Sequence, residues 1–200
     1  MHRGTAENSI NVIRGYSLNG HFEQAGHVFG GTYEFFETIL EGRYYTPAGP
    51  LGVLAIKVRG GSIGTLTGDS NLLVPFFRRY FLGGASSLRG WGRYEVAPLD
   101  AGQPIGGHTM IESSAEMRIP IFGNFGAVLF ADAGNVWQNA WAFDLNDLRY
   151  DVGPGLRYLT PIGPLRVDLG YQINPIPGLL VNGEPQPRRF RVHFSIGQAF

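Results

Sequence analysis

Apolar and polar side chains alternate regularly along the last twelve residues of the chain, 189–200. The apolar set is Phe190, Val192, Phe194 and Ile196, and the polar set between them is Arg189, Arg191, His193 and Ser195. Because successive side chains of a strand point to opposite faces, this segment predicts a strand with one apolar and one polar face. It ends on the aromatic residue Phe200. A soluble sandwich could use such a strand, but bacterial outer-membrane barrels commonly end this way, with the apolar face toward lipid and the polar face toward a wet lumen.

The same period of two recurs along the chain and predicts further strands. Strands are expected at residues 10–18, 27–40, 51–60, 109–119, 125–136, 151–160, 165–173 and 189–200. A strand of about ten residues, at about 3.3 Å per residue and a tilt near 45°, crosses roughly 23 Å, close to the apolar band of an outer-membrane barrel. The expected fold class is therefore all-β, an antiparallel transmembrane β-barrel with about eight strands present. The first fifty residues carry the weakest pattern, and Tyr44, Tyr45 and Pro47 are expected near a turn or a membrane interface.

The expected connections alternate in length. Short turns rich in proline and glycine fall near 47–50, 120–124 and 161–164, and long segments fall at 61–107, 137–150 and 174–188. Short turns on one side and long loops on the other are typical of outer-membrane barrels. The segment 61–107 is too long for a plain hairpin and is rich in apolar side chains, so it has to be buried against something. In a wide barrel the natural place is the lumen.

Composition narrows the class of protein. The chain is 44% hydrophobic and only 16% charged, yet it has no run of about 18 apolar residues, which excludes a membrane-spanning helix. Lysine and arginine balance aspartate and glutamate at 16 each, which argues against a nucleic-acid-binding protein. The absence of cysteine rules out disulfides and thiolate metal sites. The low charge matches a barrel whose lipid-facing and lumen-facing residues alternate.

Enzymatic, cofactor and metal sites are not expected. Nothing in the sequence places a histidine beside Ser86 or Ser87, as a hydrolase would need. The five histidines are scattered without the paired spacing of a metal site. Gly83 and Gly84 lack the lysine and hydroxyl residue that complete a phosphate-binding loop. We therefore expect no catalytic residues, no cofactor and no metal.

One stretch resembles a known family. Residues 77–91 read Phe-Arg-Arg-Tyr-Phe-Leu-Gly-Gly-Ala-Ser-Ser-Leu-Arg-Gly-Trp and resemble the signature of the BamA/TamA family of outer-membrane insertases and translocators, also called the bacterial surface antigen family. In that family a long loop folds back into the barrel and carries an Arg-Gly-aromatic tip, here Arg89, Gly90 and Trp91. Further similar segments follow in the family's order at 114–120, 130–137, 155–168 and the terminal strand, so the resemblance covers roughly residues 75–200.

The resemblance implies an ion pair that holds the loop inside the barrel. A guanidinium is always charged and needs fixed acceptors when it is partly desolvated. Asp132 is the only charged residue between Asn124 and Gln138, and a charge facing lipid there is unfavourable, so its carboxylate should face inward. We expect Arg89 to pair with Asp132, with Glu116 as a second candidate. The alternatives are a solvated Arg89, an Asx turn at Asp132 and an ordinary lumen-wall carboxylate at Glu116.

The resemblance also sets the expected function. Barrels of the family have sixteen strands, so residues 1–200 are expected to be the C-terminal half of one barrel domain, with the N-terminal strands and periplasmic modules absent. The implied role is non-enzymatic: outer-membrane protein insertion or polypeptide translocation, with a lateral seam and assembly signal at the last strand. The residues of that strand are Phe190, Val192, Phe194, Ile196 and Phe200.

The implied location and partners follow from this role. The protein is expected to be integral to the bacterial outer membrane, in contact with its lipids and with unfolded outer-membrane or secreted polypeptides. Periplasmic accessory or lipoprotein subunits are further candidate partners. A passive pore or structural barrel, and a soluble β-rich domain, stay open as alternatives, as does the choice between an insertase and a secretion pore.

Overall fold

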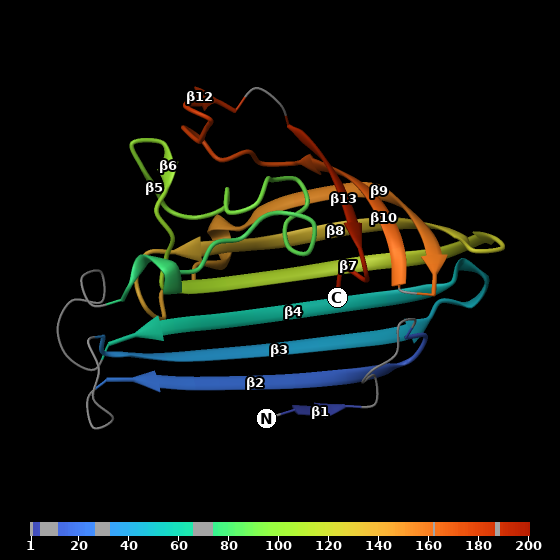
Figure 1. Ribbon diagram of the computed structural model, residues 1–200, viewed down its shortest axis with the longest axis horizontal. Coiled ribbons are helices and arrows are strands. Elements are labelled where there is room, and N and C mark those ends of the chain that lie inside the picture. The colour runs from blue at the N-terminus through green and yellow to red at the C-terminus, as the bar shows by residue number, and fades with distance from the viewer. Residues whose placement is uncertain (1, 5–11, 27–32, 66–73, 162, 187–188) are drawn as a thin grey trace.

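A nine-stranded antiparallel sheet forms the body of the protein. The computed structural model describes residues 2–4, 12–26, 33–65, 74–161, 163–186 and 189–200. The sheet strands, in spatial order, are β1 (His2–Gly4), β2 (Gly15–Ala25), β3 (Phe35–Pro47), β4 (Val53–Gly64), β7 (Thr109–Phe122), β8 (Phe125–Trp137), β9 (Arg149–Thr160), β10 (Gly163–Gln172) and β13 (Phe190–Ile196). Strands adjacent in this order pair with each other, so the sheet is a strongly curved meander (Figure 1).

The remaining elements are short. Two small hairpins are formed by β5 (Leu99–Asp100) with β6 (Gln103–Pro104), and by β11 (Leu180–Val181) with β12 (Glu184–Pro185). In the described part of the chain, 3-10 turns lie at η2 (Gly49–Leu51), η3 (Phe76–Arg78) and η4 (Leu145–Asp147). Within the described residues, no helix has the length and apolar character needed to span a bilayer.

The expected fold class is confirmed, and the strands of the second half lie close to their predicted positions. The first two long strands are displaced: 10–18 and 27–40 were expected, whereas β2 is Gly15–Ala25 and β3 is Phe35–Pro47. Parts of the expected strands, residues 10–11 and 27–32, lie outside the described residues. The pairing explains the displacement, because β3 stays in register with β4 as far as Pro47 opposite Val53 and continues past the tyrosines expected near a turn.

The connections follow the predicted alternation. Short turns join β3 to β4, β7 to β8 and β9 to β10 at one end of the sheet, and long connections join β4 to β7, β8 to β9 and β10 to β13 at the other. The longest is residues 65–108, here called the central connection. It begins later than the expected residue 61 because β4 extends to Gly64: residues 60–64 still pair with β3, and residues 60–62 still pair with β7.

The two faces of the sheet differ in polarity. On the outward face of β13, Phe190, Val192, Phe194 and Ile196 are 45–69% exposed. The inward face carries buried ionic side chains from six strands: Glu37, Lys57, Glu112, Glu116, Asp132, Asp151, Arg157, Arg166 and Asp168. An apolar outer surface around a polar interior is the arrangement of a transmembrane barrel wall.

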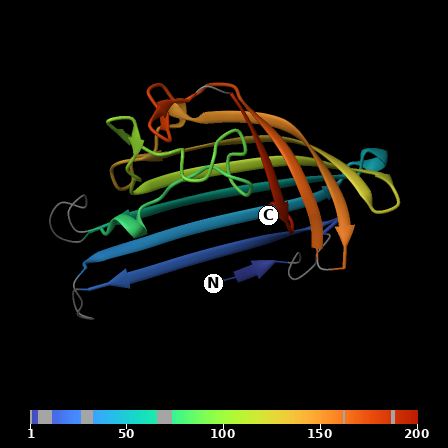
Figure 2. The same ribbon diagram turned by 45° about the horizontal axis from the view of Figure 1, so that its top comes forward.

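The main apolar core lies inside the curve of the sheet, not on its outer face. The central connection crosses the concave side (Figure 2), where it makes bridges between Tyr80 and Gly107 and between Leu82 and Val96. Its side chains pack with inward residues of the wall and of the β10–β13 connection: Ile63, Val74, Leu82, Leu88, Trp91, Val96, Met110, Val136 and Leu179. The apolar side chains of this long connection therefore hold it against the concave face of the sheet.

The C-terminus departs from the expected strand. β13 ends at Ile196, and Gly197 takes a φ of 98°, a conformation that favours glycine. The chain then turns inward, and the Phe200 ring is buried against Tyr45 and Ala55. The Arg118 guanidinium lies 5.3 Å from this ring, and its Nη2 donates to the Phe200 carbonyl at 3.3 Å. Phe200 is thus an interior residue, whereas the other four predicted strand residues face outward.

Candidate functional site

Arg89 lies at the tip of the central connection, with only 1% of the residue exposed. The tip is a tight turn in which the Trp91 amide donates to the Leu88 carbonyl at 3.2 Å, and the Gly84 amide donates to the Trp91 carbonyl at 3.1 Å. Gly83, just before the turn, has a φ of 104°, and a side chain there would collide with the Gly92 carbonyl. The glycines therefore allow the chain to fold back tightly enough to present Arg89 to the wall.

The Arg89 guanidinium is held by acceptors on two adjacent strands. Nε donates to Asp132 Oδ2 at 2.8 Å and Nη2 to Asp132 Oδ1 at 2.7 Å, which makes the pair bidentate. Nη1 donates to Glu116 Oε1 at 2.5 Å, and Nη2 also donates to Ser114 Oγ at 3.0 Å. The guanidinium carbon lies 3.5 Å from the centre of the Phe130 ring. We call Arg89, Ser114, Glu116 and Asp132 the Arg89 cluster.

The register of β7 and β8 explains why the acceptors converge. Ser114 is directly opposite Asp132, and Glu116 is directly opposite Phe130. Because residues two apart on a strand share a face, the side chains of Ser114 and Glu116 on β7 and of Phe130 and Asp132 on β8 all point inward and lie next to one another. Ser114 Oγ also donates to Asp132 Oδ1 at 2.6 Å, which fixes the carboxylate from the strand side.

The electrostatics keep the ion pair charged. Burial opposes the charged form of Arg89, but the hydrogen bonds and charges of Asp132 and Glu116 outweigh it and raise the pKa of Arg89. Glu116 is further balanced by Arg118, whose Nε lies 3.0 Å from Oε2, and by Arg157 at 3.7 Å. Removing one member of such a buried ionic group leaves its partners charged and unmatched, which typically destabilises a protein by about 3–5 kcal/mol.

Gly90 and Trp91 complete the tip. The Gly90 carbonyl accepts from Gln172 Nε2 at 2.7 Å, and a Cβ on Gly90 would lie 2.6 Å from Asp151 Cβ, so no side chain fits there. The Trp91 side chain is fully buried in the apolar core. The Arg89 carbonyl lies 2.9 Å from His193 Nε2 on β13. The structure thus brings Arg89 into contact with Asp132 and Glu116, whereas Gly90 lies against β9 and β10 and Trp91 lies in the apolar core.

The sequence reasoning missed other bonds between the central connection and the wall. Lys57 Nζ donates to the Ser86 carbonyl at 3.0 Å and to Glu112 Oε1 at 3.1 Å, and Ser87 Oγ donates to Glu112 Oε2 at 2.6 Å. The available signal was that Lys57 and Glu112 are oppositely charged residues of two predicted strands. Sequence alone could not show that these strands, β4 and β7, lie side by side.

Three further ionic contacts hold the flanks of the connection. Near its start, Arg78 Nη2 donates to Glu23 at 2.5 Å and to Glu37 at 3.1 Å. Tyr80 OH also donates to Glu37, at 2.9 Å, and burial together with this carboxylate raises the pKa of Tyr80. Beyond the tip, Arg191 Nη2 donates to Glu95 at 2.9 Å.

His21, Glu23 and Glu37 are close enough to suggest a metal site, since their ligand atoms lie within 4.8 Å of one another. The scattered positions of histidine in the sequence did not reveal this group. Arg78 bridges both carboxylates and supplies a positive charge there. The two carboxylates are therefore already paired with a cation that the chain itself supplies, the Arg78 guanidinium.

Ser62 is a second feature that the sequence reasoning overlooked. Residues 60–64 read Gly-Gly-Ser-Ile-Gly, which has the glycine and serine spacing of a hydrolase nucleophile elbow. The segment lies within β4, not at a strand-to-helix turn, and the buried Ser62 Oγ is 3.2 Å from Thr109 Oγ1 and accepts from the Trp141 amide at 2.9 Å. These contacts give the Ser62 hydroxyl a structural role within the sheet, not the position of a nucleophile.

Comparison with known proteins identifies relatives along the whole length. Residues 2–200 match the Omp85 superfamily domain. Among curated proteins, the outer membrane protein assembly factor BamA of Nitratidesulfovibrio vulgaris is 30% identical, over 99% of this chain and 24% of that protein. BamA of Neisseria meningitidis serogroup B is 28% identical, over 76% of this chain and 22% of that protein. The chain therefore spans about a quarter of the length of these relatives.

A solved structure has the same fold. The crystal structure of BamA from Haemophilus ducreyi lacking POTRA domains 1-3 superposes with a TM-score of 0.74 and 22% identity, covering 98% of this chain and 40% of that one. This likeness supports the architecture of the sheet and its order of strands.

Proposed function

The chain belongs to the Omp85 superfamily, and from this premise we propose that it takes part in assembling proteins into the outer membrane. The protein is an outer-membrane β-barrel protein with the apolar outer face and polar inner face described above. Its curated relatives carry the name outer membrane protein assembly factor. In this role the barrel binds polypeptides that enter the outer membrane and carries out no covalent chemistry.

The observation that carries the proposal is the Arg89 cluster. A passive pore needs no buried arginine at the tip of a long internal connection, and such a connection fills interior space that conduction would use. Here the connection is held through a bidentate Arg89–Asp132 pair and a second carboxylate, Glu116. The proposed role of the cluster is to keep the central connection against β7 and β8, so that the wall near the last strand has a defined shape.

The second part of the proposal concerns β13. In the described sheet this strand pairs with β10 on one side and forms the edge on the other. The backbone groups at a sheet edge can template an incoming strand. We assign β13 the role of a lateral seam at which a client strand is received.

The test is assembly in cells depleted of the native protein and supplied with the full-length protein bearing Arg89→Ala or Asp132→Ala. Folded outer-membrane proteins are counted by heat-modifiable gel mobility, and the position of the central connection is read from its protease sensitivity. Both variants are expected to lower assembly and expose the connection. Arg149→Ala is the matched control, since Arg149 pairs with Asp147 outside the cluster, at 3.0 Å.

The outcomes separate the candidate functions. Full assembly activity with the connection still protected in Arg89→Ala and Asp132→Ala would overturn the role of the cluster. Deletion of residues 76–95 that leaves ion conductance unchanged, with no assembly activity in the unaltered protein, would favour a passive pore. Secretion of one soluble partner without any assembly of membrane proteins would point to a translocation pore.

A further inference from the structure

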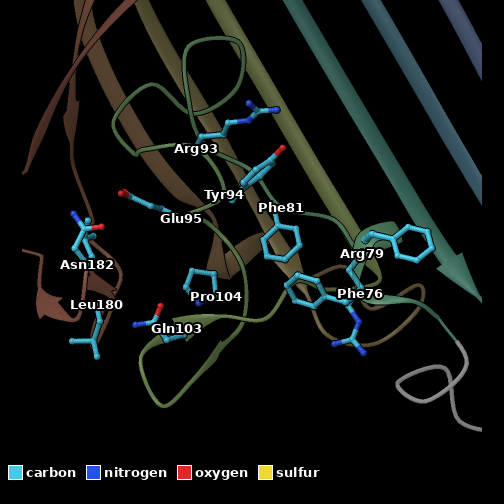
Figure 3. Close-up of a pocket in the computed structure, with 12 residues that line it drawn as sticks. Phe76, Arg79, Phe81, Arg93, Tyr94, Glu95, Gln103, Pro104, Leu180 and Asn182 are labelled. Atoms are coloured by element: carbon cyan, nitrogen blue, oxygen red, sulfur yellow. The ribbon is translucent and has the colours of Figure 1, made fainter.

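A cavity of about 610 Å³ lies between the central connection and the connection from β10 to β13. Figure 3 shows residues of the central connection along most of its wall, with Leu180 and Asn182 of the β11–β12 hairpin on the opposite side. None of its lining residues belongs to the Arg89 cluster. Its volume falls in the range of about 300–1,000 Å³ that is typical of small-molecule sites.

One wall of this cavity is a row of aromatic rings. Phe76, Phe81 and Tyr94 follow one another in Figure 3, with ring centres 5.4 Å apart for the first pair and 5.6 Å for the second, both edge to face. Phe76 is 59% exposed and Tyr94 is 52% exposed. Contiguous exposed apolar groups, unlike rings scattered singly over a surface, mark an interface or a ligand-binding groove.

The charge of the cavity is positive. The guanidinium carbon of Arg93 lies 4.7 Å from the Tyr94 ring centre, and that of Arg79 lies 6.0 Å from the Phe76 ring centre. Arg93 is exposed and has no ion pair with a carboxylate among the described residues. The carboxylate in the wall, Glu95, already binds Arg191 at 2.9 Å and accepts from the Gly92 amide at 2.8 Å. An arginine beside a ring therefore remains available to an anion.

Side-chain amides supply neutral hydrogen-bonding groups. Gln103 at the start of β6 and Asn182 in the β11–β12 turn both line the cavity. Each amide offers donors and an acceptor, which suits hydroxyl groups better than it suits a purely apolar ligand. The wall thus combines three chemistries: flat apolar faces, a cation next to one of them, and amides across from them.

We propose that this cavity binds a phosphorylated saccharide. A sugar ring has an apolar face that can lie on Tyr94 and hydroxyls that can bond to the amides. Its phosphate would pair with Arg93, because guanidinium groups bind phosphate oxygens through two parallel hydrogen bonds. The ligand is either a free sugar phosphate or the head group of a glycolipid, and both carry the same chemistry. The proposal is independent of the assembly function.

The experiment measures binding to the full-length protein purified from outer membranes in detergent. Isothermal titration calorimetry is run with glucosamine 6-phosphate, glucosamine and inorganic phosphate, and with a penta-aspartate peptide as an acidic polypeptide probe. Glucosamine 6-phosphate is expected to bind most tightly. A second arm uses vesicles that contain a glycolipid with a phosphorylated glucosamine head group, and binding there but not in solution assigns the ligand to the membrane.

Two variants separate the roles of charge and ring. Arg93→Gln is expected to weaken binding of glucosamine 6-phosphate at least about tenfold while leaving glucosamine unchanged, since the neutral amide cannot form charge-assisted hydrogen bonds to the phosphate. Tyr94→Asn is expected to weaken both sugars. Asparagine is chosen because Tyr94 has a φ of 69°, which asparagine tolerates. Arg189→Gln, another exposed arginine, is the matched control.

Several results would overturn the proposal. These are equal affinity of the Arg93→Gln and unaltered proteins for the sugar phosphate, equal or tighter binding of inorganic phosphate, tighter binding of penta-aspartate, and no binding in either arm. Heat-modifiable mobility verifies that each variant is folded. Because assembly is not the readout, failure of this proposal leaves the proposed function untouched.

Discussion

Gly170 on β10 lies directly against the backbone of Arg89, so that a Cβ on Gly170 would collide with the Arg89 carbonyl and lie 2.7 Å from the Gly90 amide nitrogen. The tip of the central connection is therefore positioned from two sides. β7 and β8 hold the guanidinium, and the missing side chain on β10 leaves room for the backbone behind it.

Gly170→Ala should displace the tip while leaving the ionic side chains in place. The colliding atoms are backbone, which cannot rotate away, so the tip has to move from the wall. We expect faster proteolysis of the central connection and reduced assembly. Gly60→Ala is the control, because a Cβ on Gly60 meets nothing closer than the Met110 carbonyl at 3.8 Å. Equal protease sensitivity of the two variants would refute the close-contact argument.

Arg89→Lys should fall between the unaltered protein and Arg89→Ala in stability. An ammonium keeps the charge, but it cannot donate to both oxygens of Asp132 and to Glu116 in the fixed geometry of a guanidinium. Arg89→Ala should lower the free energy of unfolding by about 3–5 kcal/mol, because Asp132 and Glu116 stay buried without their main cation. Urea unfolding followed by gel mobility gives the order, and a lysine variant as stable as the unaltered protein would show that charge alone suffices.

Lys57 and Glu112 should behave as a coupled pair. Each residue is nearly fully buried, and Glu112 also accepts from Ser87 of the central connection. In a double-mutant cycle, Lys57→Met and Glu112→Gln should together destabilise the protein by less than the sum of the single changes, with a coupling of about 0.5–3 kcal/mol. Strict additivity would mean that the buried contact contributes nothing to the unfolding free energy.

Tyr80 should link stability to alkaline pH. Its pKa is raised in the folded protein, so above about pH 10, where an unfolded tyrosine ionises, the unfolded state loses a proton that the folded state keeps. The contribution of this tyrosine is therefore complete below about pH 10 and falls as the pH rises further. The difference in unfolding free energy between the unaltered protein and Tyr80→Phe should narrow over that range. A constant difference would contradict the assignment.

A photo-crosslinking residue should report the proposed seam. Val192 on β13 and Leu156 on β9 are similarly exposed on the outward face, at 64% and 60%. The edge position of β13 predicts crosslinks to newly made outer-membrane proteins from position 192 and only lipid contacts from position 156. Equal crosslinking of clients from both positions would mean that they approach the wall without preference for the edge.

Sequence patterns anticipated the strands of the second half because period-two alternation, flanking glycine and proline, and strand length agreed there. In β3 they disagreed: Pro47 and the two tyrosines suggested a turn, but twelve paired positions with β4 run through this segment. Pairing between strands is a non-local interaction, so local residue types could not locate the end of β3.

The Arg89 cluster could be predicted only in part, because several of its surrounding contacts are also non-local. Asp132 could be recognised as inward-facing from its isolated charge, and Arg89 and Glu116 from the family signature. The contacts of Lys57, Glu37 and His193 depend on which strands adjoin and on where residues 74–108 cross the sheet. Phe200 was placed on the strand by its neighbours' alternation, whereas the φ of Gly197 turns it inward.

The bonds at the tip also set an order of events in folding. Arg89 is separated by 43 residues from Asp132, Gly90 by 82 from Gln172, and the Arg89 carbonyl by 104 from His193. Contacts so distant along the chain form only after long loops have closed, which makes them slow and late. The tip cannot be complete until β13 has taken its place beside β10 and brought His193 to the Arg89 carbonyl, so the tip closes only after the last strand has joined the sheet.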